Sequence, residues 1–370
     1  MSPSAVCEAS PESQGSVNGH NHDGFAAVKS SNGTVSLAES LAGLQTEQKN
    51  SKTTNIDSMS SLELCRVINE EDASVAQAVQ TCLPQIADAI DIIVPRLLSG
   101  GRVIYTGAGT SGRLGVLDAS EIPPTFSAPP GQFVGLIAGG DYAIRNAVEG
   151  AEDSEELGAT DLAELTPPLS KNDTLVGIAS SGRTPYVLGG LKYASSIGAA
   201  TVGLACVKPS SLGSLCDVLI ECVTGPEVVT GSTRLKAGTA TKMVRILCPV
   251  FPVFFLSHQL IMTYQILNMI STGSQIRTGK TFGNLMVDLK MSNEKLQNRA
   301  RRVARMVVPP SSALDIESEE VLDAVLADCD GQVKLSILVA TLGCSPAEGR
   351  AKLAAASGSL RQALQGNVTD

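Results

Sequence analysis

The sequence predicts a doubly wound α/β fold: a parallel five-stranded sheet flanked by helices, followed by a small C-terminal helical subdomain. Helical patterns lie between several of the predicted strands, and this alternation favours parallel strands joined by helices. Past residue 290 the apolar period is that of helices. The strands are indicated by short apolar runs without polar alternation, typical of burial on both faces, at 102–106, 133–138, 174–180, 201–206 and 217–222.

The chain before the C-terminal subdomain divides into two parts. Residues 1–50 are rich in Ser, Asn, Gly and His with little apolar periodicity, so we expect a disordered leader. Residues 51–290 form the predicted α/β domain. It opens with one or two helices before Gly100, with Ser60 or Ser61 as a possible cap.

The C-terminal part, residues 291–370, forms the predicted helical subdomain. Its last segment, "SPAEGRAKLAAASGSLRQALQ", has Ser345 in the place of a helix cap and Pro346 in the first helical position. We expect this subdomain to follow the sheet as a separate group of helices.

One block, residues 244–265, does not fit the surrounding pattern. "TRLKAGTATKM" before it and "ILNMISTGSQIRTG" after it have the pattern of one continuous helix, whereas the block carries two helix-breaking prolines and three of the seven Phe. Its first codons, for Val-Arg, can begin GTNAG, and its last codon, for Gln, can be CAG. We therefore hypothesise a retained intron of 22 codons, with a genuine insertion as the alternative.

The composition excludes several classes of protein. The formal charge is -9 and Lys and Arg form no run, so we expect no nucleic-acid partner. The longest apolar run, 246–256, contains prolines and is about half a membrane span, so we expect no membrane segment and a cytoplasmic protein. The nine cysteines are scattered and show no C-x-x-C or zinc-ligand spacing.

A glycine-rich loop, "GAGTSGR", follows the first predicted strand. It fits G-x-G-x-x-G, but a dinucleotide site needs an acidic residue at the end of the next strand, and none stands there. It also has the glycine spacing of a nucleotide P-loop, but Arg113 and Leu114 occupy the places of Lys and Ser/Thr. Both nucleotide interpretations therefore fail at the residue that carries their chemistry.

Hydroxyl side chains follow two of the predicted strands. Because the carboxyl ends of parallel strands meet at one sheet edge, we expect these clusters to lie together near helix N-termini. Hydroxyls, backbone N–H groups and a positive helix end suit a phosphate dianion without a metal. The alternative is that these residues are ordinary N-caps. The candidate phosphate-binding residues are Gly109, Thr110 and Ser111 in the first cluster and Ser180, Ser181 and Thr184 in the second.

Four long motifs resemble the N-acetylmuramic acid 6-phosphate etherases, which have the sugar isomerase (SIS) fold and bind phosphosugars. The motifs are "GAGTSGRLGVLDASEIPPTF", "GLIAGGDYAIRNAVEGAEDS", "SSGRTPYV" and "GSTRLKAGTATK". The resemblance runs from residue 44 to the C-terminal helices, leaving out 244–265. It implies cleavage of the lactyl ether of N-acetylmuramic acid 6-phosphate to N-acetylglucosamine 6-phosphate and D-lactate.

The resemblance also implies roles for individual residues. An elimination across C2 and C3 followed by water addition needs a base for the C2 proton and an acid for the departing oxygen. The family's acid matches Glu121 and its second glutamate, the base, matches Glu152; we expect them to share one pocket. From the residues alone, Glu121 could equally be a polar helix end, and Glu152 belongs to an acidic run of the kind that is usually solvated.

A third group of candidates lies in "STRLKAG". Lys236 could contact the phosphate or the lactate, with Ser232 and Thr233 beside it, although a lysine there is more often on the surface. The resemblance implies no metal or organic cofactor, because carboxyls can carry both proton transfers. It also implies a homodimer, with each site completed near the subunit boundary.

Two rival functions remain open. One is a non-catalytic phosphosugar-binding regulator like the glucokinase regulatory protein, but such regulators carry two SIS copies and this chain has a single "GAGTSGR". The other is an aldose-ketose isomerase, which would explain the phosphate cluster but not the motif around Glu152. Release of lactate from the muramic acid substrate would distinguish all three.

Overall fold

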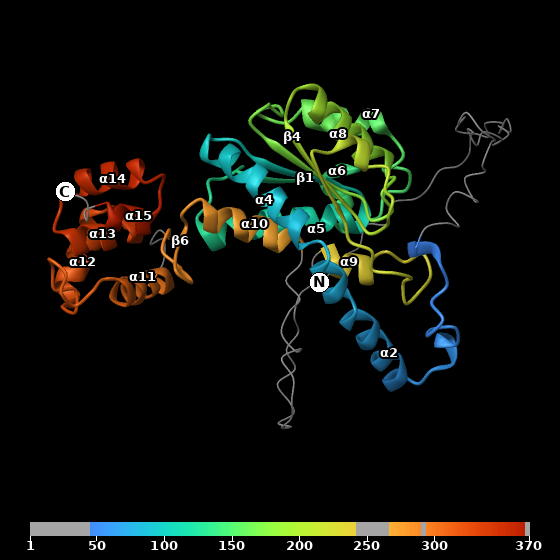
Figure 1. Cartoon of the computed structure of the whole chain (residues 1–370), viewed down its shortest axis with the longest axis horizontal. Helices are drawn as coiled ribbons and strands as arrows, with labels where there is room; N and C mark the ends of the chain where they lie inside the picture. Colours follow the sequence, from blue (N-terminus) through green and yellow to red (C-terminus); the bar gives the residue numbers. More distant parts are fainter. Residues whose placement is uncertain (1–44, 242–265, 290–293, 367–370) are drawn as a thin grey trace, which may run out of the picture. The chain divides into compact units, whose positions relative to one another are not determined.

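The computed structural model describes residues 45–241, 266–289 and 294–366 (Figure 1). Five parallel strands form one sheet in the order β2-β1-β3-β4-β5, which confirms the predicted fold class. Every observed strand lies within two residues of its predicted bounds. The strands are β1 (Val103–Gly107), β2 (Phe133–Ile137), β3 (Thr174–Ile178), β4 (Ala200–Ala205) and β5 (Val218–Glu221).

Both faces of the sheet are covered by helices, and this explains why the strands lack polar alternation. Tyr105 and Val176 point into a core with α4, α5 and α10, whereas Ile104 and Leu175 point into a core with α7 and α8. Figure 1 shows the two helical layers on either side of the strands. The helices are α4 (Leu83–Leu98), α5 (Gly109–Phe126), α7 (Glu155–Ala163), α8 (Pro185–Ser196) and α10 (Ile266–Arg277).

Three helices precede the sheet rather than the one or two predicted. α2 (Ser61–Ala73) and α3 (Val75–Gln80) are separated by a break at Ser74, and α4 follows. The predicted cap of α2 is confirmed. The Ser60 hydroxyl accepts from the Glu63 N–H at 3.4 Å, and the Glu63 carboxylate accepts from the Ser60 N–H at 2.8 Å.

Residues just before α2 are part of the packed domain. Thr46 is fully buried, and Asn50 and Thr53 are each 8% exposed. The Thr53 hydroxyl donates to the Val228 carbonyl at 2.9 Å. The packed chain thus includes residues that the sequence analysis assigned to the leader, while residues 1–44 lie outside the described part. Short 3-10 turns occur here and before β5, as η1 (Gln45–Glu47), η2 (Ile56–Ser58) and η3 (Gly213–Leu215).

The C-terminal helices have a core of their own, to which the β6–β7 hairpin contributes. Ser345 caps α14 and Pro346 occupies its first turn, as predicted. The last predicted segment is two helices instead of one, because Ser357 and Gly358 adopt positive φ and end α14. The elements are β6 (Thr281–Phe282), β7 (Leu285–Met286), α11 (Glu294–Val307), α12 (Glu319–Asp328), α13 (Val333–Leu342), α14 (Pro346–Ala355) and α15 (Leu360–Gln365).

The block at 244–265 lies outside the described residues. The chain on either side of it is helical, in α9 (Lys236–Thr241) and α10, and these two helices pack against each other. One more short helix, α6 (Gly140–Arg145), follows β2. None of the helices in the described ranges is long and apolar enough to span a bilayer.

Candidate active site

The site lies where the strand order of the sheet reverses. β1 pairs with β2 on one side and with β3 on the other, so the helices that follow β1 and β3 begin at the same sheet edge. α5 begins after Ala108 and α8 after Thr184, and neither helix has a side-chain cap. The first turn of α5 therefore presents backbone N–H groups to this edge, whereas in α8 Pro185 has no N–H and the Tyr186 N–H donates to the Glu152 carbonyl. No hydroxyl side chain forms a capping hydrogen bond to either helix, although Thr184 stands at the N-cap position of α8.

The two hydroxyl clusters meet at this edge. The Ser111 and Ser180 hydroxyl oxygens lie 3.3 Å apart, although 69 residues separate them in sequence. Each of these serines is 9% exposed. Ser181 and Thr184 lie on the same short segment as Ser180 and are half-buried. The result is a cradle of hydroxyl and N–H groups whose chemistry suits an anion.

Glycines allow α5 to begin this close to the strand. A Cβ at Gly112 would lie 2.7 Å from the Gly107 carbonyl oxygen, so only glycine fits where the first turn returns to β1. Gly109 has φ +52, with open space around the position of a Cβ. The glycines of "GAGTSGR" therefore shape the cradle, independently of any nucleotide.

Glu152 lies beside this cradle. It lines a pocket of about 180 Å³ together with Gly109 and Arg113. Its backbone carbonyl accepts from the Tyr186 N–H at 3.0 Å, in the first turn of α8. Partial burial, with the nearby Asp153 and Glu149 carboxylates, raises the pKa of Glu152 above its usual value. A carboxylate with a raised pKa is suited to accepting a proton.

The segment that carries Glu152 is held by close helix packing. Ser154 caps α7 by accepting from the Leu157 N–H at 3.0 Å. α7 then packs directly on α8, because a Cβ at Gly158 would lie 1.9 Å from the Tyr186 carbonyl oxygen. This backbone-to-backbone contact fixes the position of Glu152 relative to the second hydroxyl cluster.

Glu121 lies elsewhere in the chain. It is exposed and is twelve positions after Gly109 in α5, which places it about 18 Å along the helix from the cradle at 1.5 Å per residue. α5 runs antiparallel to the strands, from their carboxyl ends toward their amino ends, so Glu121 lies toward the amino ends of the strands. Glu121 is not among the residues lining the pocket of Glu152. Within one chain, the structure does not bring the two glutamates together.

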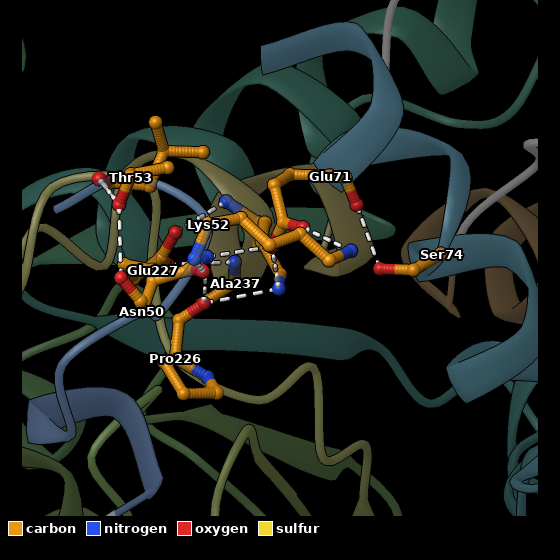
Figure 2. A network of polar contacts seen from close by, with 10 residues as sticks. Asn50, Lys52, Thr53, Glu71, Ser74, Pro226, Glu227 and Ala237 are labelled. Atoms are coloured by element: carbon orange, nitrogen blue, oxygen red, sulfur yellow. Dashed lines mark hydrogen bonds and ion pairs between the residues drawn. The ribbon is translucent and has the colours of Figure 1, made fainter. Parts of the chain in front are cut away.

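Lys236 is buried rather than on the surface, with 4% of its area exposed. It bonds to a polar network around Glu71 and Pro226, which Figure 2 shows. Its ammonium donates to the Glu71 carboxylate at 2.8 Å and to the Pro226 carbonyl at 3.0 Å. Glu71 also accepts from Asn50 at 2.7 Å and from Lys52 at 2.8 Å. These partners lower the pKa of Glu71 to about 2, against its burial. The Lys236 cation is thus already paired with a protein carboxylate.

The same network fixes the start of α9. The buried Glu227 carboxylate accepts from the backbone N–H groups of Lys236 and Ala237, at 2.8 and 3.0 Å. Burial raises the pKa of Glu227 even so. The first turn of α9 adjoins the cradle, since a Cβ at Gly238 would lie 3.6 Å from the Thr110 methyl carbon.

The last two candidates lie just before α9. The same Gly238 position is 3.7 Å from the Thr233 carbonyl oxygen, so Thr233 and Thr110 lie near one another. Ser232 and Thr233 are half-buried. Thr233 thus lies near the first hydroxyl cluster through its backbone carbonyl.

Sequence reasoning missed Arg113, Tyr186 and Glu71. Arg113 had a signal, because it ends the glycine loop one helical turn after Gly109, but it was considered only as the residue that breaks a P-loop pattern. Tyr186 acts through its backbone, which no side-chain motif reveals. Glu71 pairs with a lysine 165 residues away, so nothing local could have identified it.

Comparison with known proteins agrees with the fold. Residues 85–195 match the family model of the glucokinase regulatory protein N-terminal SIS domain. This part of the chain is therefore similar to a SIS domain. Within the described residues, no three His, Cys, Asp or Glu side chains gather as a metal ion would need.

Relatives that align with nearly the whole chain identify the family more specifically. The N-acetylmuramic acid 6-phosphate etherase of Aliivibrio fischeri is 48% identical over 324 residues, 88% of this chain and 98% of the relative. The etherase of Rhodopirellula baltica is 48% identical over 328 residues, which are 89% of this chain and 98% of the relative. The etherase of Caldanaerobacter subterraneus is 45% identical over 325 residues, which are 88% of this chain and 96% of the relative. The chain belongs to the N-acetylmuramic acid 6-phosphate etherase family, and so to the carbon–oxygen lyases.

Proposed function

We propose that this chain cleaves the D-lactyl ether of N-acetylmuramic acid 6-phosphate, giving N-acetylglucosamine 6-phosphate and D-lactate. One observation carries the proposal: a hydroxyl-lined cradle at the N-termini of α5 and α8, neither of which has a side-chain cap, adjoins a pocket lined by Glu152. The cradle suits the phosphate, and the carboxylate suits removal of a proton from the sugar. Membership of the etherase family supports the same reaction.

The proposed reaction proceeds in two stages. Glu152 takes the C2 proton, the C2 electron pair forms a C2=C3 double bond, and the C3–O bond breaks with protonation of the lactate oxygen by an acid. Water then adds its hydroxyl to C3 while a proton returns to C2. One water is consumed and no electrons are transferred, so the chemistry calls for no metal or organic cofactor.

We assign the phosphate to the backbone N–H groups at Gly109 and to the hydroxyls of the cradle. The cradle hydroxyls are those of Thr110, Ser111, Ser180, Ser181 and Thr184. Ser232 and Thr233 extend the same rim from the loop before α9. Because the Lys236 cation is paired with Glu71, we assign Lys236 to holding α9 in place rather than to binding substrate.

The proposed role of Glu121 requires a second copy of the chain. We propose a homodimer in which Glu121 of one subunit supplies the acid near the site of the other. The exposure of Glu121 and its distance of about 18 Å along α5 from its own cradle support this arrangement. We further propose a cytoplasmic location; the free thiols of the described cysteines are typical of a reducing compartment.

Incubation of the purified protein with N-acetylmuramic acid 6-phosphate tests the proposal. We expect equimolar D-lactate and N-acetylglucosamine 6-phosphate. In D₂O the product should carry deuterium at C2, because elimination and hydration exchange that position. A regulator would bind the sugar phosphate without releasing lactate, and an isomerase would rearrange C1 and C2 with the ether intact. Either result would contradict the proposed function.

A further inference from the structure

The pocket beside Glu152 contains a single cation. Its lining comprises backbone and small apolar side chains, the carboxylates of Glu149 and Glu152, and the guanidinium of Arg113. No carboxylate in the described ranges pairs with Arg113, whose hydrogen bonds to these residues all go to backbone carbonyls. Among the described residues, Arg113 therefore forms no ion pair with an acid, although Glu149 and Glu152 line the same pocket.

The guanidinium of Arg113 is held in a fixed orientation. Its Nε donates to the Ile144 carbonyl at 3.0 Å, and its Nη2 donates to the carbonyls of Ala143 at 2.8 Å and Asn146 at 3.5 Å. These bonds occupy one edge of the planar group and anchor it to the last turn of α6. The N–H groups of Nη1 point away from that edge and have no acceptor among the described residues.

The proposed substrate has two anionic groups, whereas the hydroxyl cradle accounts for only one. The phosphate on C6 takes the cradle. The carboxylate belongs to the lactyl group on C3, and C3 is bonded to C2, from which Glu152 removes the proton. That carboxylate must therefore enter the same pocket as the Glu152 carboxylate, where an unpaired negative charge would be unfavourable.

We propose that Arg113 is a substrate-binding, specificity-determining residue: its Nη1 edge binds the carboxylate of the D-lactyl group and so distinguishes the ether substrate from sugar phosphates without that acid. The inference rests on the proposed function. Arginine is suited to this role because its planar fork matches a carboxylate, and three carbonyls have already fixed its orientation.

The test compares the natural substrate with its analogue in which the lactyl carboxylate is a carboxamide. With the wild-type protein, we expect kcat/KM to be about 10- to 100-fold lower for the amide, the range for loss of a charged hydrogen bond. With Arg113→Met, the two substrates should react at nearly equal rates. Arg113→Lys should keep part of the preference, because it retains the charge but not the fork.

Two controls separate binding of the carboxylate from other roles. N-acetylglucosamine 6-phosphate has the phosphate but no lactyl group, so its inhibition constant should be the same for the wild type and Arg113→Met. Arg145→Met removes an exposed arginine from the same helix end as the Arg113 anchor and should leave the preference unchanged. Thermal unfolding of each variant checks that it is folded.

The outcomes are distinct. An undiminished preference in Arg113→Met would overturn the inference, as would an inhibition constant that rises by the same factor as KM, since Arg113 would then read the phosphate. Binding of both sugar phosphates to Glu152→Gln, with and without Arg113→Met, repeats the comparison without turnover. Absence of lactate release from the wild type would contradict the proposed function, while this binding comparison would still decide the role of Arg113.

Discussion

Single residues set the acid-base chemistry of the pocket, and Glu152 shows this most directly. Its pKa is raised by partial burial and by two neighbouring acids, Asp153 and Glu149. As the proposed base, Glu152 must be ionised to act, so activity should fall as the pH drops through this raised pKa. We expect the acidic limb of kcat/KM to lie above the usual glutamate pKa of about 4.5.

Neutralising the neighbours tests this explanation. In Glu149→Gln/Asp153→Asn the repulsion is gone, so the acidic limb of the pH profile should move to lower pH, measured as kcat/KM between pH 4 and 8. Glu155→Gln is a matched control, because this exposed acid pairs with Lys192 instead. A limb that does not move would mean that another group titrates.

Between elements, the buried Glu71–Lys236 pair joins α2 to α9. The folded pKa of Glu71 is about 2, below its ordinary 4.5, so its ionised form stabilises the fold above about pH 4.5 and this contribution is lost as the pH falls toward 2. Glu71→Gln leaves Lys236 unpaired and should lower the free energy of unfolding by about 3 kcal/mol at pH 7.

Urea unfolding at pH 7 and at pH 3.5 measures this effect. The difference between wild type and Glu71→Gln should shrink at the lower pH, because acid weakens the same interaction in the wild type. Lys208→Met is a matched control, since that exposed lysine makes only a longer ion pair, 3.7 Å, with Glu221. A difference that is independent of pH would contradict the assignment of the low pKa to Glu71.

The α7–α8 contact should couple stability to activity. In Gly158→Ala the new methyl would lie 1.9 Å from the Tyr186 carbonyl, so the helices must separate, at a cost of about 1–3 kcal/mol. Separation also moves the Tyr186 N–H that holds the Glu152 carbonyl, so kcat should fall. Chemical unfolding and lactate release measure the two effects. Gly366→Ala, with its nearest atom at 3.5 Å, should change neither.

At the scale of the whole molecule, the separation of the two glutamates predicts complementation between subunits. Glu121→Gln and Glu152→Gln should each be inactive alone. After the two variants are mixed and their subunits exchanged, half the dimers are mixed, and each has one site with both glutamates. About a quarter of the sites should then be active. Lactate release that stays at background after confirmed exchange would show that both glutamates act in one chain.

The block at 244–265 gives a second prediction at this scale. We propose that the functional chain lacks these residues, so that α9 and α10, which pack together, are joined directly. A protein without the 22 residues should be more soluble and more active than the full chain, by sedimentation and lactate assays. Equal activity of the two forms would reject this, and transcripts that always retain the 66 nucleotides would reject the intron hypothesis.

The sequence predicted features that depend on local pattern. The five strands were located within two residues, because burial on both faces leaves continuous apolar runs. The caps at Ser60 and Ser345 followed from the residue type and its position before a helix. The two hydroxyl clusters were placed at one edge because parallel strands end together, and the contact between Ser111 and Ser180 agrees with this.

Contacts between distant segments could not be predicted in this way. The pairing of Lys236 with Glu71 depends on how α2 packs against α9, so it cannot be predicted from the local sequence. The distance of Glu121 from the cradle of its own chain could not be predicted for a related reason. A sequence motif indicates the family to which the chain belongs. It does not show that Glu121 lies about 18 Å along α5 from the cradle.

The sequence alone thus determined the fold class, the order of the strands along the chain, and the loops that carry hydroxyls and acids, since these follow from residue type and periodicity. Only the tertiary structure decided which charges are free to act. Lys236 is neutralised by Glu71, whereas Arg113 is anchored by carbonyls and retains its charge in the pocket of Glu152. The physical reason is that the availability of a charge depends on its neighbours in space, and packing determines those neighbours.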